Sequence, residues 1–317
     1  MSAYEMLQKI DEGEIKAMIV LGSNPVVSSP NASFVERALR KLELLVVVDL
    51  FETETAKLAH WLLPGSSFLE GEGTLTNVEG RVFHRARALP TPGEARLDYE
   101  LICELAEALG RGEHFRYGGI EDVFNELARA SAGGKADYGG ITYERLKREQ
   151  GVFWPCPAPD HPGKPRMFTK RFAHPDGKAK LSGITPKLPA EPIDADYPYI
   201  LTTGRLGNHY LSGVQTRRTP GLMKKAPEPV AEIHPWLAKR IGLGVGDRVR
   251  ITSRRGSLVF AVKVTEGIQP RTVFVPFHWG EELSVNKLTN DALDPTSRMP
   301  EFKLCAVRVE RAAESFS

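Results

Sequence analysis

The feature that most constrains the fold is a pair of short apolar segments, each of which stops at a polar residue or turn. Residues 15–21 predict a buried strand that ends at Gly22-Ser23-Asn24-Pro25, and residues 44–48 predict a second one that ends on Asp49. A helical pattern separates them, with Asn31 as its expected cap. Buried strands that alternate with helices are typical of a parallel sheet. We therefore predict an α/β domain over residues 1–150.

Further elements are expected in this domain. A short helix is predicted over residues 52–61, closed by Pro64. Glycines and alternating residues over 71–81 indicate a loop with a short strand or hairpin. Apolar stripes predict helices at residues 97–109, 120–130 and 143–150.

Residues 151–197 are expected to form a connector, and residues 198–317 a mostly β domain. Ten of the chain's 23 prolines fall between residues 151 and 198, and proline fixes φ and removes a backbone donor. The glycine-rich residues 242–246 follow a helix and precede a strand, which is the reverse of a phosphate loop, so we predict a tight connection. The expected strands are residues 199–203, 248–253, 257–265 and 272–276, with a helix at 235–241.

Composition excludes several classes of protein. The chain has 42 Lys and Arg against 40 Asp and Glu, a balance that argues against a nucleic-acid-binding protein. Its apolar runs are too short to span a membrane and its first twenty residues lack an apolar export core, so we expect a cytoplasmic protein. The distant cysteines Cys103, Cys156 and Cys305 predict neither a disulfide framework nor an iron–sulfur cluster.

Two aspartates are candidate nucleotide ligands. Asp49 follows a buried strand, where ligands of open α/β sheets bind, and its carboxylate can accept both hydroxyls of a ribose. Asp98 lies after a Pro-Gly turn, and a carboxylate can accept the two adjacent donors on the Watson–Crick edge of guanine. From spacing alone, a plain helix N-cap is the more frequent role for a residue such as Asp98.

A second group of polar residues follows the strand expected at residues 199–203. Thr203, Gly204 and Arg205, with His209 and residues 216–218 behind them, supply donors suited to phosphate or another anion. A solvated basic loop explains the same residues equally well. The aromatic residues at 277–279 are expected to pack rather than bind, and nothing pairs His278 with a nucleophile. These residues alone name no reaction.

The same residues carry a resemblance to a known family. The chain is similar, over nearly its whole length, to the C-terminal portion of molybdopterin oxidoreductases of the dimethyl sulfoxide reductase superfamily. The cytoplasmic assimilatory nitrate reductases resemble it most, followed by formate dehydrogenase catalytic chains. Residues 209–218 (His-Tyr-Leu-Ser-Gly-Val-Gln-Thr-Arg-Arg) most favour the nitrate branch. The other stretches that carry the resemblance are residues 22–25, 49–64, 71–81, 92–98, 202–205, 273–279 and 286–307.

The resemblance implies a fold and a cofactor. In that family two pterin guanine dinucleotides hold one molybdenum atom. The first domain would be a Rossmann-like fold that binds one guanosine end, and the last would be a double-psi β-barrel over both pterins. Phe277 would lie near the substrate funnel. The cofactor-binding residues carried over by position are Asn24, Val48, Asp49, Gly71 and Asp98 in the first domain and Thr203, Gly204, Arg205, Leu206, Gly207, Asn208, His209, Tyr210, Leu211, Ser212, Asn286 and Lys303 in the barrel.

Three positions depart from the family pattern. Gly71 stands where many relatives have Lys, which puts one phosphate contact in doubt. Leu211 replaces a common His, and Gln215 replaces a common Met.

The family's N-terminal part, with its cysteine motif for a [4Fe–4S] cluster and its molybdenum ligand, has no counterpart in this sequence. We therefore expect a separate N-terminal half or subunit, together with an electron-donor protein, and no catalytic residue or metal ligand in this chain. Alone, the chain is expected to be inactive and prone to associate. Nitrate reduction is the first expectation and formate oxidation the second. A non-catalytic protein that binds or inserts the pterin dinucleotide, and an inactive gene remnant, stay open as alternatives.

Overall fold

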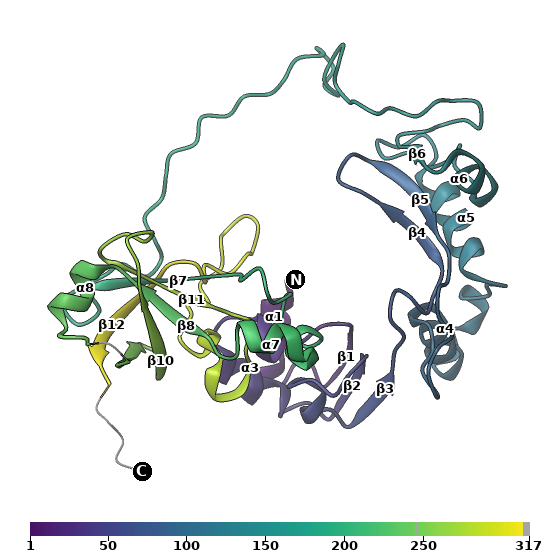
Figure 1. Cartoon of the computed structure of the whole chain (residues 1–317). Coiled ribbons are helices and arrows are strands. Elements are labelled where there is room, and N and C mark those ends of the chain that lie inside the picture. Colours follow the sequence, from purple (N-terminus) through teal and green to yellow (C-terminus); the bar gives the residue numbers. More distant parts are fainter. Residues whose placement is uncertain (245, 313–317) are drawn as a thin grey trace. The chain divides into compact units, whose positions relative to one another are not determined.

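The computed structural model describes residues 1–244 and 246–312 (Figure 1). Their contacts divide the chain into two compact units. The first unit comprises Met1–Leu63 and Pro186–Ser317, and the second comprises Pro64–Thr185. This division by contacts differs from the expected cofactor-binding domains, whose boundaries stay a prediction. Within the predicted tight connection at 242–246, Val245 lies outside the described residues.

A parallel sheet with helices on one face begins the first unit. Strand β1 (Ala17–Leu21) pairs in parallel with β2 (Leu44–Asp49), and β3 (Trp61–Pro64) completes the order β1-β2-β3. Helices α1 (Ala3–Asp11) and α3 (Ala32–Leu39) pack with the sheet in one apolar core. That core includes Leu7, Ile10, Val20, Val35, Leu39, Leu45 and Val47. The two predicted strands and their parallel arrangement are confirmed, and β2 is buried as expected. The prediction that β1 is buried was wrong, because α1 and α3 cover the face that carries Val20 and leave Ile19 and Leu21 exposed.

Two local predictions in this region were wrong. Residues 52–61 form only a 3-10 turn, η1 (Ala56–Leu58), before the chain extends into β3. Pairing with β2 outweighs weak helix propensity here, and the Leu45 N–H also donates to His60 Nδ1 at 2.9 Å. Asn31 holds the N-cap position of α3, but its side chain donates to Asp291 Oδ2 at 3.0 Å and makes no capping bond.

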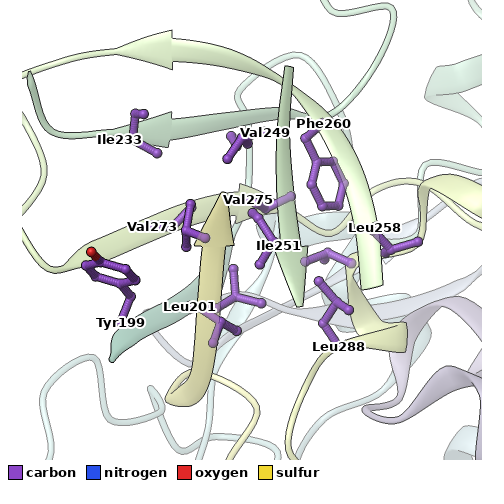
Figure 2. Packing of buried hydrophobic residues seen from close by; sticks show 14 of the residues in the cluster. Tyr199, Leu201, Ile233, Val249, Ile251, Leu258, Phe260, Val273, Val275 and Leu288 are labelled. Carbon is purple, nitrogen blue, oxygen red and sulfur yellow. The ribbon is translucent and has the colours of Figure 1, made fainter. Parts of the chain in front are cut away.

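A closed six-stranded barrel forms the rest of the first unit, in the order β10-β8-β11-β7-β12-β9. Two of its pairings, β11 with β7 and β10 with β8, are parallel. Figure 2 shows side chains such as Leu201, Ile251 and Val273 pointing into its apolar interior. The strands are β7 (Tyr199–Gly204), β8 (Val230–Ile233), β9 (Arg248–Ser253), β10 (Gly256–Val264), β11 (Thr272–Pro276) and β12 (Cys305–Arg311).

Short helices connect the barrel strands and position the loops around its rim. The predicted helix at residues 235–241 is present as α8 (Pro235–Arg240). The chain also contains α2 (Pro25–Ser28), α7 (Pro220–Lys225), α8 (Pro235–Arg240), and the 3-10 turns η3 (Thr216–Arg218), η4 (Glu281–Leu283) and η5 (Val285–Lys287).

The second unit contains a small antiparallel sheet and three helices. The predicted hairpin is confirmed as β4 (Gly73–Thr76) and β5 (Arg81–Arg85), which β6 (Val152–Phe153) extends. Its buried core contains Val82, Phe124, Tyr143 and Leu146. The three predicted helices are confirmed as α4 (Asp98–Ala108), α5 (Ile120–Ser131) and α6 (Tyr143–Glu149), with a 3-10 turn η2 (Gly112–His114) between the first two.

The Pro-rich segment connects β6 to β7. Its described residues form neither a helix nor a strand (Figure 1). A buried Arg145 fixes its start, because Nη2 donates to the His161 carbonyl at 2.8 Å and Nη1 donates to Cys156 Sγ at 3.2 Å. Within residues 1–244 and 246–312, no helix has the length and apolar character of a membrane span.

Candidate functional site

The loop that follows β7 lies at one end of the barrel. Thr203 and Gly204 end β7, and the parallel partner β11 ends beside them at Pro276. The Phe277 N–H then donates to the Gly204 carbonyl at 3.2 Å. The neighbouring ends of the parallel strands β7 and β11 therefore place residues 203–212 next to residues 277–280.

His278 connects the barrel to this loop. The side chain is completely buried, and its two ring nitrogens contact the loop backbone at two points. Nε2 accepts from the Leu206 N–H at 2.8 Å, and Nδ1 donates to the Leu211 carbonyl at 2.6 Å. Burial lowers the pKa of His278, so the ring is neutral with its proton on Nδ1.

The His209 side chain is also buried, and both of its ring nitrogens contact protein groups. Its Nε2 donates to the Ala226 carbonyl at 2.8 Å, and its Nδ1 lies 3.1 Å from the Thr216 hydroxyl. Its ring also meets the Trp279 ring edge-on, with centroids 4.9 Å apart. Any cofactor contact predicted at this position therefore rests on the backbone.

Several hydrogen-bond donors of the loop at residues 205–212 have no protein partner among the described residues. Within the part of the chain that the structure describes, the N–H groups of Gly207, Asn208 and Leu211 hydrogen-bond to no other group. The Arg205 side chain is exposed and likewise forms no ion pair among the described residues. Unpaired backbone donors beside a guanidinium make an anion-binding surface.

Lys303 adds a second positive charge to this surface. Its Nζ donates to the Thr203 carbonyl at 2.6 Å and lies 5.4 Å from the centre of the Phe277 ring. Burial, together with the charge of Arg205, lowers the pKa of Lys303. An anion bound between the Arg205 and Lys303 charges would offset their mutual repulsion, so the pair is suited to a phosphate group.

The basic residues predicted near this loop do not all reach its surface. Arg217 turns inward and its Nη2 donates to Glu54 Oε1 at 2.8 Å. The Arg218 guanidinium lies 4.5 Å from the centre of the Phe51 ring and donates to the Glu52 carbonyl. Arg205 is therefore the arginine of the predicted group that stays available to a ligand.

Glu54 was not among the residues that the sequence singled out. Burial opposes its ionisation, but the hydrogen bonds from Arg217 and from Asn24 Nδ2, at 2.7 Å, outweigh this and lower its pKa. A Cβ at Gly280 would overlap its carboxylate, so this position requires glycine. A single Glu in a loop forms no recognisable sequence motif, and its partner Arg217 lies 163 residues away, so no local sequence signal indicated this contact.

The other residues of the first unit that the resemblance predicts as cofactor-binding differ in burial and in their hydrogen-bond partners. Asn24 and Asn286 are buried, and both side chains hold backbone or polar groups in place. Asn24 Oδ1 accepts from Thr55 Oγ1 at 2.8 Å, and Asn286 Nδ2 donates to the Val27 carbonyl at 2.7 Å. Val48 is buried in β2, whereas Asp49 is half-buried at the strand end and accepts from the Leu50 N–H.

Gly71 and Asp98 lie close together in the second unit. A Cβ at Gly71 would lie 2.9 Å from Leu97, the residue before Asp98. The alternative role of Asp98 as an N-cap is wrong, because Leu97 occupies that position and Glu100 accepts from the Leu97 N–H. Among the described residues, the exposed Asp98 carboxylate has no hydrogen-bond partner, and partial desolvation raises its pKa.

Two family models match this chain. The model of the molybdopterin oxidoreductases matches residues 1–108. The model of the molydopterin dinucleotide binding domain matches residues 199–306, which contain the barrel and its loop. The chain therefore belongs to the molybdopterin oxidoreductase family.

Individual relatives agree with this assignment. The assimilatory nitrate reductase catalytic subunit of Bacillus subtilis is 54% identical over 97% of this chain and 44% of the relative. The F420-dependent formate dehydrogenase subunit alpha of Methanocaldococcus jannaschii is 43% identical over 98% of this chain and 46% of the relative. The chain thus spans about 45% of the length of these relatives.

A solved structure shares the fold. Acetylene hydratase from Pelobacter acetylenicus superposes with a TM-score of 0.76 at 22% sequence identity. The match covers 97% of this chain and 46% of that protein. It supports the architecture of an α/β sheet, a hairpin unit and a closed barrel.

Proposed function

We propose that this chain is the dinucleotide-binding C-terminal half of a cytoplasmic molybdenum oxidoreductase that reduces nitrate to nitrite. The observation that carries the proposal is the loop after β7, where unpaired backbone donors lie beside Arg205 and Lys303. The similarity to a nitrate reductase subunit over nearly the whole chain supports the choice of substrate. In this proposal the barrel is a double-psi barrel and the sheet of β1–β3 is Rossmann-like.

The residues present fit a molybdenum bis(pterin guanine dinucleotide). Gly207, Asn208 and Arg205 would hold phosphate oxygens through N–H groups, and Lys303 would add a charge. Asp98 would accept the two donors of guanine, because its carboxylate is exposed and unpartnered among the described residues. The Asp49 carboxylate would accept hydrogen bonds from the two hydroxyls of a ribose.

The remaining predicted positions would contribute shape and backbone groups. Phe277, half-buried at the end of β11, would line the substrate funnel. Leu206, Tyr210, Leu211 and Ser212 belong to the same loop. When bound, the metal centre supplies the two-electron chemistry, and this chain orients the cofactor and keeps it in place.

We further propose that the remaining part of the family fold completes the protein and supplies the [4Fe–4S] cluster and the molybdenum ligand. A parallel sheet is normally covered on both faces, yet Ile19, Leu21 and Leu44 of β1 and β2 are about 40% exposed on the face opposite α1 and α3. Their side chains would pack against apolar groups of that remaining part. An electron-donor protein would complete the system.

The test is reconstitution. The N-terminal part of the Bacillus subtilis relative is expressed separately, loaded with cofactor and mixed with this chain. The expected result is nitrate reduction with reduced viologen as electron donor. A complex that contains the full cofactor but leaves nitrate unchanged contradicts the nitrate assignment. The same complex is assayed with formate, because a formate dehydrogenase subunit is 43% identical to this chain.

A second candidate function is storage or insertion of the dinucleotide without catalysis. The exposed Asp98 carboxylate favours this function, because the chain would present an acceptor for guanine even without the rest of the fold. Calorimetric titration with GMP should then give measurable affinity, about tenfold weaker in Asp98→Ala. Asp160→Ala, an exposed aspartate of the same unit, is the matched control. An absence of GMP binding to the isolated chain rejects this candidate.

A further inference from the structure

The loop at residues 205–212 carries a strained residue in its centre. Leu211 has φ +47°, in the left-handed region that a leucine rarely adopts. Such a conformation is energetically unfavourable for a leucine and persists only where the surroundings hold it. The Leu211 side chain is 45% exposed, so its own packing does little to hold the backbone. The restraint must act on the backbone itself.

His278 supplies that restraint. Its Nδ1–H donates to the Leu211 carbonyl at 2.6 Å, and its Nε2 accepts from the Leu206 N–H at 2.8 Å. The two contacts lie five residues apart on opposite sides of one rigid ring. The ring itself is fully buried between Phe277 and His209, with ring centres 5.0 and 5.6 Å away. The imidazole therefore fixes the distance between residues 206 and 211.

The backbone at Gly213 passes close to the backbone of His278. Gly213 has φ +74°, and a Cβ there would overlap the His278 carbonyl oxygen. Between the two fixed points lie Gly207 and Asn208, whose N–H groups are unpaired among the described residues. An unpaired N–H contributes to anion binding only when its direction is already set, since ordering a loop costs conformational entropy.

We infer that His278 is a positioning residue that sets the backbone of residues 206–211 for a pyrophosphate group. It touches neither the reacting atoms nor the dinucleotide and acts through the loop. This inference rests on the proposed function only in that the anion is the pyrophosphate of a guanine dinucleotide.

The same geometry predicts an acid limit for binding. A protonated His278 has no lone pair on Nε2, so the Leu206 N–H loses its acceptor. The charged groups that face the ring are Arg205 and Arg217, and His209 is the neighbouring titratable group. Both arginines oppose protonation of His278, as burial does. Binding should therefore be complete above pH 6.5 and decline below it.

The experiment measures GDP affinity of the full chain by calorimetry between pH 8 and 5.5. His278→Phe removes both contacts and should weaken binding about 10- to 100-fold at pH 7.5. His278→Gln retains one donor and one acceptor on its amide, so it should recover most of the affinity and lose the decline below pH 6.5. His234→Gln, which removes a histidine contact to the Trp236 N–H elsewhere in the barrel, is the matched control.

The outcomes separate this inference from the proposed function. If His278→Phe folds and binds GDP as tightly as the wild type, His278 does not position the loop. Should that variant fail to fold, the pH profile of His278→Gln decides: a decline identical to that of the wild type overturns the inference. A wild-type chain that binds no GDP contradicts the anion site itself, and with it both proposals.

Discussion

Glu54 and Arg217 form an ion pair that joins two segments of the first unit that lie 163 residues apart. Glu54 Oε1 accepts from Arg217 Nη2 at 2.8 Å, and the side chains are only 11% and 23% exposed. Asn24 Nδ2 donates to the second carboxylate oxygen. The pair thereby holds the segment after the loop at residues 205–212 against the loops of the parallel sheet.

Loss of this pair should cost more stability than loss of an exposed one. Glu54→Ala leaves Arg217 and Asn24 without their acceptor, and we expect a loss of about 2–4 kcal/mol in the free energy of unfolding. Glu281→Ala breaks the exposed Lys57–Glu281 pair nearby and should cost about 1 kcal/mol or less. Urea unfolding at pH 7 measures both. Equal losses would show that the Glu54–Arg217 pair stabilises the fold no more than the exposed Lys57–Glu281 pair does.

The stabilising effect of Glu54 should depend on pH in one direction. Its pKa in the folded protein is lower than the usual 4.5, so the contribution is complete above pH 4.5 and is lost as the pH falls through the folded pKa. The difference in unfolding free energy between wild type and Glu54→Gln should shrink below pH 4.5. Urea titrations from pH 7 to 3.5 provide the comparison. A difference that grows toward acid pH has the wrong sign for this account.

The charges of Arg205 and Lys303 should affect the binding of anionic ligands alone. Arg205→Ala and Lys303→Ala should each weaken GDP binding about tenfold and reduce its dependence on salt concentration. Neither should weaken binding of guanosine, which has no phosphate. Lys239→Ala, an exposed lysine on α8, is the control. Equal weakening by the control would assign the effect to overall charge.

The uncovered face of the parallel sheet should carry the contact with the rest of the fold. Ile19→Asp places a charge on that face and should abolish association with the N-terminal part of the Bacillus subtilis relative, measured by size-exclusion chromatography with light scattering. Val78→Asp in the β4–β5 turn is the control, since Val78 is fully exposed. Association that survives Ile19→Asp would place the contact elsewhere.

Elements with a regular apolar pattern were predictable from the sequence. The segments at residues 17–21 and 44–49 show continuous apolar runs, and the barrel strands at 248–253 and 272–276 are β-branched. Strand β12 is missing from the predicted strands, although Cys305, Val307 and Val309 face the core and Arg308 and Glu310 alternate with them, which is the period-two pattern of a half-buried strand. Strand β8 has only four residues, too few for a periodic signal.

The site was predictable by residue type and only partly by role. The donors of residues 203–205 stood out because they follow a strand. His209 and Arg217 turn inward because they hydrogen-bond to Ala226 and Glu54, respectively. Partners that are not neighbours in the sequence cannot be recognised from local residue spacing. The sequence assigns no role to His278, because no pattern pairs it with a nucleophile. Its partners in the structure are backbone groups, which leave no signal in a sequence.

We propose that this chain holds a molybdenum pterin dinucleotide together with the rest of the family fold. Native mass spectrometry of the protein purified from its own host examines both parts of this proposal, because one spectrum reports bound cofactor and any further polypeptide. We predict a mass that includes the N-terminal part of the fold, molybdenum and two pterin guanine dinucleotides. A bare chain of 35.1 kDa would contradict the claim.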